Sequence, residues 1–165
     1  MRAPESKIMD LAAARVWRES LRAAGRRLAM TNGCFDLLHR GHAEYLARAR
    51  EQADALLVAI NSDASVRAIK GPTRPVVAEQ DRAFMLACLE SVDAVLVFGE
   101  QKPLGLFEAL VPDLYVKGGD YTVETIVQEE RHLLERLGTR FAFIPFVGGF
   151  STTGTIAKVR GGGDA

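Results

Sequence analysis

Five short apolar runs, each followed by a helical pattern, constrain the fold of this chain more than any other feature. The run at 55–60 is apolar throughout, as in a strand that is buried on both faces of a sheet. Strands that alternate with helices form βαβ units, which give parallel sheets with right-handed crossovers. The sequence therefore predicts an α/β fold in three α/β/α layers, with a parallel sheet of about five strands. We expect the strands at 27–30, 55–60, 94–98, 113–117 and 140–144.

Helical patterns fill the segments between these runs. We expect a first helix from Ser6, as its N-cap, to just before Gly25. The apolar residues at 84–86 and Leu89 are expected to belong to the core. The chain then divides into an N-terminal helical extension (1–26), one domain (27–160) and a flexible tail (161–165). The other helices are expected at 41–53, 63–69, 79–90, 104–110 and 123–137, with a last helix opened by 151–153.

The composition indicates which binding partners and which cellular compartment to expect for the chain. The 165 residues suit one domain, and 21 basic residues balance 21 acidic ones. A net charge of zero gives no general reason to bind nucleic acid or an acidic membrane, so we expect neither. Two cysteines, Cys34 and Cys88, do not make a disulfide framework and suit a reducing compartment. With no signal-peptide core and no apolar run of about 20 residues, a cytoplasmic location is expected.

The stretch 31–42 (TNGCFDLLHRGH) joins the first strand to the next helix and is the principal candidate site. In open α/β sheets ligands bind at this edge, and a helix N-terminus attracts anions. His39 and His42 are three apart, on one face of the first helical turn, so they favour a phosphate site. Gly33 and Gly41 let the backbone approach a ligand closely. Zinc is the competing reading, but the spacing lacks the four-apart pair and its glutamate.

Other strand ends carry polar residues that the same sheet edge would bring together. Some have an ordinary structural alternative: Lys70 and Arg82 as solvated charges, Asp36 as a turn cap, and Asp120 as a turn former. Ser151, Thr152 and Thr153 are either N-caps or a second phosphate site. The further candidates at strand ends are Asn61, Asp63, Lys117 and Gly118.

Together these motifs resemble the nucleotidyltransferase superfamily that is marked by a His-x-Gly-His motif, present here at 39–42. The superfamily's Ser-Ser/Thr-Thr run appears at 151–153. More narrowly, the chain resembles the adenylyltransferases that activate D-glycero-β-D-manno-heptose 1-phosphate, over about 27–159. The matching stretches are 61–65, 70–76, 89–93, 112–114 and 116–121.

This resemblance implies a Rossmann-like fold and transfer of AMP from ATP to the sugar 1-phosphate. The products would be ADP-heptose, a precursor of the lipopolysaccharide core, and pyrophosphate. Mg²⁺ would enter with the ATP, with no certain protein ligand and Asp36 as the only candidate. We expect a homo-oligomer, a dimer or higher. The implied catalytic residues are His39, His42, Lys70 and Arg82; the nucleotide or phosphate contacts are Asn32, Gly33, Cys34, Phe35, Gly41, Lys117, Gly118, Asp120, Ser151, Thr152 and Thr153; the other substrate contacts are Asp36, Asn61 and Asp63.

Two departures from the superfamily pattern bear on the late loop. Ile156 stands where an arginine often follows the Ser-Thr-Thr run, and 146–149 replace the Arg-Thr-Glu-Gly of related glycerol-phosphate cytidylyltransferases. The second departure argues against a cytidylyltransferase, which remains the first alternative. A nucleotide-binding module without catalysis is the alternative from another class.

Overall fold

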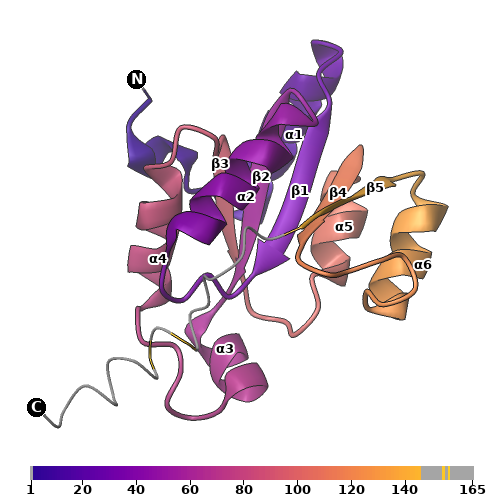
Figure 1. The fold of residues 1–165 in the computed structure, drawn as a ribbon. Coiled ribbons are helices and arrows are strands. Elements are labelled where there is room, and N and C mark those ends of the chain that lie inside the picture. The colour runs from indigo at the N-terminus through magenta and orange to yellow at the C-terminus, as the bar shows by residue number, and fades with distance from the viewer. Residues whose placement is uncertain (1, 146–153, 155, 157–165) are drawn as a thin grey trace, which may run out of the picture.

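The computed structural model describes residues 2–145, 154 and 156. Its centre is a five-stranded parallel sheet with the strand order β3-β2-β1-β4-β5. Helices cover both faces of the sheet (Figure 1), which confirms the predicted Rossmann-like α/β/α fold. The strands are β1 (Leu28–Gly33), β2 (Ala55–Asn61), β3 (Ala94–Phe98), β4 (Leu114–Gly118) and β5 (Arg140–Ile144).

Two sets of helices sandwich the sheet. One face packs against α1 (Leu11–Ala23), α5 (Leu104–Leu110) and α6 (Gln128–Arg136). The other face packs against α2 (Arg40–Glu51) and α4 (Glu79–Ala87). The remaining helices are the short 3₁₀ helix η1 (Pro4–Lys7) and α3 (Asp63–Lys70).

Strand β2 shows why its sequence is apolar throughout. Leu56, Val58 and Ile60 point into the core beneath α2 and α4, while Leu57 and Ala59 point into the core beneath α1, α5 and α6. Successive side chains of a strand alternate between faces, so a strand covered on both faces needs apolar residues at every position. All seven residues of β2 are buried.

The chain reverses its direction of travel across the sheet at β1. From β1 it moves outward to β2 and β3, and then returns to place β4 on the other side of β1. The carboxyl ends of β1 and β4 thus flank a topological switch point, where open α/β sheets bind ligands. This geometry places the polar ends of the central strands together.

Several predicted bounds are wrong. β1 continues to Gly33, which pairs with Ile60, so 31–33 belong to a strand and not to a loop. Asp10, not Ser6, caps the first long helix by accepting from the Ala13 N–H at 2.8 Å. α6 begins at Gln128, five residues after the predicted start.

The predicted apolar stripe on α4 is only partly core. Leu86 is fully buried, but Phe84 and Met85 are 39% and 52% exposed. α4 uses its buried face for Arg82, Ala83, Leu86 and Ala87 instead. The last predicted helix and the expected tail fall largely outside the described residues. No helix in the described part of the chain is long and apolar enough to cross a membrane.

Candidate active site

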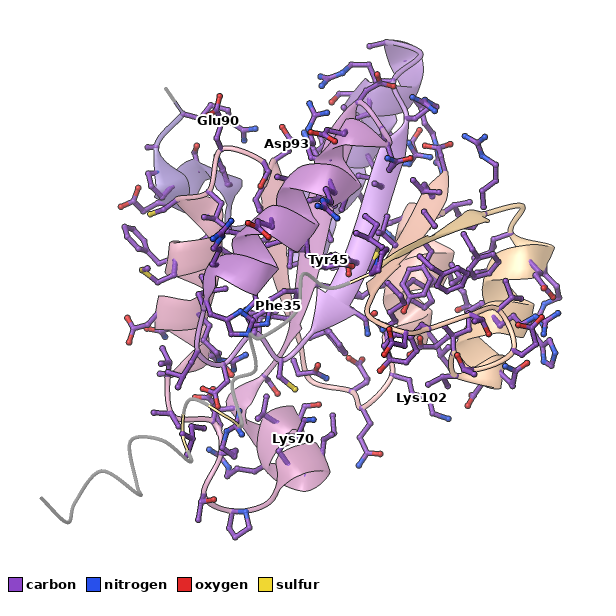
Figure 2. The ribbon with its side chains drawn as sticks, viewed as in Figure 1. Phe35, Tyr45, Lys70, Glu90, Asp93 and Lys102 are labelled. Carbon is purple, nitrogen blue, oxygen red and sulfur yellow. The ribbon has the colours of Figure 1, made fainter. Side chains whose placement is uncertain are left out.

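A cavity of about 450 Å³ opens at the carboxyl ends of the central strands. Figure 2 shows Phe35, Tyr45 and Lys70 toward this end of the sheet, with Glu90 and Asp93 at the opposite end. The cavity therefore lies at the switch point, as the sequence predicts. The predicted site residues that line it are Asn32, Gly33, Cys34, Phe35, Asp36, His42, Asn61, Lys70, Lys117 and Gly118.

The two histidines meet at the start of α2. His39 is the N-cap, and its Nδ1 accepts from the His42 backbone N–H at 3.3 Å. The two imidazoles are stacked, with ring centroids 3.8 Å apart. Only His42 lines the cavity, and Gly41 is buried beside it in the first helical turn. The structure thus places His42 in the cavity wall and stacks His39, which does not line the described cavity, against it.

The electrostatics of His42 favour a neutral ring. Burial, and to a smaller extent the neighbouring His39, lower the pKa of His42 to about 4. Its Nδ1 is buried and has no hydrogen-bond partner among the residues that the structure describes. At neutral pH this imidazole is a neutral donor in a low-dielectric position, where a hydrogen bond to developing negative charge is strong.

A hydrogen-bond network orients Lys117 on the β4 side of the cavity. Its Nζ donates to Asn32 Oδ1 at 2.9 Å. The Tyr115 hydroxyl lies 2.6 Å from the same Asn32 oxygen and 2.9 Å from Glu130 Oε2. Burial lowers the pKa of Lys117, although Glu130 and Cys34 act in the opposite direction. The network joins the ends of β1 and β4 and holds one cation in the cavity wall.

Asp36 holds a loop instead of presenting free oxygens. Its Oδ1 accepts from the Val76 and Val77 N–H groups at 2.8 and 3.0 Å, and its Oδ2 accepts from Arg74 Nε at 2.5 Å. Burial raises the pKa of Asp36, but these hydrogen bonds outweigh burial and the pKa lies below its ordinary value. Asp36 was predicted to contact a substrate or a metal ion. In the structure both of its carboxylate oxygens already accept hydrogen bonds from the protein.

Arg82 and Asp63 lie behind the cavity, not in it. The Arg82 side chain is fully buried and donates to Cys34 O at 2.6 Å, Val77 O at 2.9 Å and Asp63 Oδ1 at 2.8 Å. The expected phosphate contact of Arg82 stays a prediction, because this guanidinium is buried on protein acceptors and does not line the described cavity. Asp63 is the acceptor of that pair, and Asp120 is exposed outside the cavity wall.

Sequence reasoning missed part of the cavity wall. Two of the missed residues could have been found from their positions in the sequence. Arg74 follows Lys70 in the same Pro/Gly segment, and Tyr45 follows His42 by one helical turn. Gln101 follows β3, the one strand end to which no chemistry was assigned. The missed residues are Thr31, Tyr45, Ile69, Arg74, Gln101 and Tyr121.

Three predicted phosphate contacts cannot be compared with this geometry. Ser151, Thr152 and Thr153 lie outside the described residues. Within the described part of the chain, no group of three or more His, Cys, Asp or Glu side chains is arranged to hold a metal ion. The charged side chains in the wall of the described cavity are the cations Lys70, Arg74 and Lys117 and one carboxylate, Asp36, which is already paired with Arg74. Cations and N–H donors are the groups that bind phosphate.

Several known proteins are similar to this chain in sequence or in fold. It is 48% identical to the bifunctional protein HldE of Mesorhizobium japonicum over 97% of its length, and 50% identical to that of Rhodospirillum rubrum over the same share. It spans about a third (32%) of the length of each relative. In fold, it is similar to the lipopolysaccharide core biosynthesis protein of Thermoplasma volcanium GSS1, with a TM-score of 0.62 and 24% identity over 76% of this chain and 100% of that one.

The family model described as cytidylyltransferase-like matches residues 30–147. That match runs from β1 to just beyond β5 and includes all of the described cavity wall. It agrees with the resemblance carried by the His-x-Gly-His motif. The chain belongs to the cytidylyltransferase-like family of nucleotidyltransferases.

Proposed function

We propose that this chain is an adenylyltransferase that joins AMP from ATP to D-glycero-β-D-manno-heptose 1-phosphate. The products are ADP-heptose, for lipopolysaccharide core biosynthesis, and pyrophosphate. The observation that carries the proposal is a single cavity at the switch point that gathers His42, Lys70 and Lys117. The close similarity to bifunctional HldE proteins supports the adenylyl acceptor. The reaction takes place in the cytoplasm, where ATP is available.

The reaction needs positioning and charge neutralisation more than covalent catalysis. A phosphate oxygen of the sugar 1-phosphate attacks the α-phosphorus of ATP and forms a new O–P bond. The bond from that phosphorus to the α,β-bridging oxygen breaks, and pyrophosphate leaves with the electron pair. The attacking oxygen is already anionic, so no protein nucleophile or base is required.

His42 stabilises the charge that develops on the leaving pyrophosphate. Its neutral ring donates a hydrogen bond, and the N-terminus of α2 adds backbone N–H groups and a favourable dipole. His39 holds His42 by stacking and by capping the helix. The backbone of 33–35 lies close to the α-phosphate. Gly33 has little room to spare, since a Cβ there would meet the Phe35 ring at 3.1 Å.

The other candidates divide between contact and positioning. Lys117 and Asn32, with Gly118 and Asp120, serve the nucleotide side, and Lys70 serves the phosphates. Asn61 contacts the sugar substrate from the end of β2. Asp36, Asp63 and Arg82 act by holding loops. We assign Ser151, Thr152 and Thr153 to the β- and γ-phosphates.

Magnesium is part of the ATP substrate in this proposal. Asp36 does not fit as its ligand, because both carboxylate oxygens already accept hydrogen bonds. A Mg²⁺ ion that is bound through a triphosphate needs few protein ligands. The expected homo-oligomer stays a prediction, and no step above depends on it.

A pyrophosphate-release assay tests the proposal. The purified chain, with ATP, Mg²⁺ and D-glycero-β-D-manno-heptose 1-phosphate, is expected to release one pyrophosphate for each ADP-heptose formed. Release with CTP and glycerol 3-phosphate alone would replace the proposal with a cytidylyltransferase. Calorimetric binding of ATP without turnover on any sugar phosphate would replace it with a non-catalytic module.

A further inference from the structure

The cavity has two cationic sides. Lys117 stands on the β4 side, where the Asn32 network fixes it. Lys70 and Arg74 stand on the other side, at the end of α3 and in the segment that leads to α4. Adenylyl transfer brings together two phosphate-bearing substrates, and each needs cations of its own to approach the other. Arg74 has no role in the function proposed above.

Arg74 is held by one edge of its guanidinium. Its Nε donates to Asp36 Oδ2, and the side chain is 15% exposed at the cavity wall. Its two terminal nitrogens make no hydrogen bond to any residue within the described part of the chain. A guanidinium fixed at Nε keeps those terminal N–H groups for a second anion, and this fork geometry matches a phosphate.

The partner of Arg74 is itself fixed. The Asp36 side chain is 1% exposed and also accepts from the Val76 and Val77 N–H groups. Arg82 bonds to Val77 O and Cys34 O, so it joins the same two segments from the other side. The segment 74–77 is thus fixed to 34–36 at several points. Such preorganisation lowers the entropy lost when a ligand binds.

We propose that Arg74 binds the phosphate of the acceptor sugar, and that Asp36 is the residue that positions it. The inference rests on the proposed adenylyl transfer and deepens it by naming the acceptor-phosphate site. Arg74 and Lys70 lie on the α3 side of the cavity, together with Asn61 at the end of β2. Lys117 and the start of α2 are left to the nucleotide. The acceptor phosphate therefore approaches from the side opposite Lys117.

Steady-state kinetics of the full chain test the assignment. Arg74→Lys keeps the positive charge but removes the planar, two-pronged N–H donors of the guanidinium. This variant is expected to raise KM for heptose 1-phosphate about tenfold and to change KM for ATP less than twofold. Arg67→Lys is the matched control, because Arg67 is an exposed arginine on α3 outside the cavity wall. It is expected to leave both KM values unchanged. An equal rise in both KM values for Arg74→Lys, or no rise, overturns the assignment.

A double-mutant cycle tests the positioning role of Asp36. Asp36→Asn is expected to raise the acceptor KM selectively and to add little in the Arg74→Lys background, because both changes break one interaction. Additive effects, or a lower Tm with unchanged KM values, would give Asp36 a purely structural role and overturn this part.

If the chain binds ATP but does not turn over heptose 1-phosphate, the proposed function is wrong. The anion site at Arg74 can still be tested in that case. Calorimetric titration with inorganic phosphate, in the presence of saturating ADP, then reports on the anion site directly. Affinity about tenfold weaker in Arg74→Lys than in Arg67→Lys supports the site. Equal affinity in the two variants overturns it.

Discussion

The two ends of the sheet use polar residues in opposite ways. At the amino end, an aspartate precedes each of β2, β3 and β4 and accepts a backbone N–H at or next to the start of a neighbouring strand. Asp54 accepts from Arg27 N, Asp93 from Leu56 N and Asp113 from Leu28 N, at 2.7–2.8 Å. Each carboxylate also has an arginine partner, for example Arg50 on Asp93.

At the carboxyl end, part of a polar side chain is fixed by the protein while another of its polar atoms has no hydrogen-bond partner among the described residues. The His42 ring is packed between His39 and Phe35, yet its buried Nδ1 has no partner in the described structure. Among the residues that the structure describes, Arg74 is anchored through Nε alone. Leaving a buried polar group unpaired costs stability, so this arrangement is expected where a ligand completes it. The comparison separates aspartates that are paired with backbone and arginine donors at the amino end from side chains that keep open donors at the carboxyl end, although one buried nitrogen of Arg18 at the amino end also lacks a partner among the described residues.

The largest expected effect is on catalysis at the carboxyl end. His42→Ala removes the neutral donor to the leaving group, and kcat is expected to fall about 100-fold or more with the fold intact. His132→Ala is the control, because His132 is an exposed histidine on α6. Pyrophosphate release and thermal unfolding measure the two properties. A near-wild-type kcat in His42→Ala would contradict a catalytic role for the carboxyl end of the sheet.

The next effect is on stability at the amino end. Asp93→Ala leaves the Leu56 N–H and Arg50 without their shared acceptor, and is expected to cost about 2 kcal/mol of unfolding free energy. The kcat of the folded fraction is expected to stay unchanged. Glu90→Ala, which removes an exposed carboxylate at the same end (Figure 2), serves as the control in urea unfolding. A loss of kcat in Asp93→Ala would contradict a purely structural amino end.

The smallest effect is the dependence of stability on pH. The folded chain keeps His42 neutral down to about pH 4, while the unfolded chain protonates this residue near its ordinary pKa of 6.5. The unfolded state therefore binds more protons between these values, and stability falls as pH falls from 6.5 toward 4. His42→Asn is expected to reduce that fall by on the order of 1 kcal/mol at pH 5. Parallel curves for wild type and variant in urea unfolding would contradict the assigned burial effect.

The positions of the strands could be predicted well, because a strand that is buried on both faces is a continuous run of apolar residues in the sequence. The bounds of β3 and β5 agree with the predicted runs 94–98 and 140–144. β1 was predicted too short because its last residues, 31–33, are polar or glycine and read as loop. α6 begins late because the Gln128 side chain folds back onto the carbonyls of Glu124 and Ile126, which helical periodicity does not reveal.

The site was predictable as a location but not as a set of contacts. The strand-end rule brought Lys70, Lys117 and His42 to one edge from distant parts of the sequence. It did not tell a cation that faces the cavity from one that is buried behind it. Arg82 was expected to bind phosphate and Arg74 was assigned no role, yet only Arg74 lines the cavity. That difference depends on which acceptors each guanidinium meets, and those acceptors are remote in sequence.

The central place of β1 has a consequence for how the chain acquires its site. β1, β2 and β3 are adjacent in the sheet and consecutive in the sequence, so they can pair while later residues are still being synthesised. The Leu28 to Asp113 bond, which joins β1 to the start of β4, spans 85 residues. Contacts of such long range form late because their loop-closure entropy is large. Lys117, Gly118 and Tyr121 complete the cavity wall only when β4 docks, so a nascent chain that stops before β4 holds three of the five strands and a cavity that is open on its β4 side.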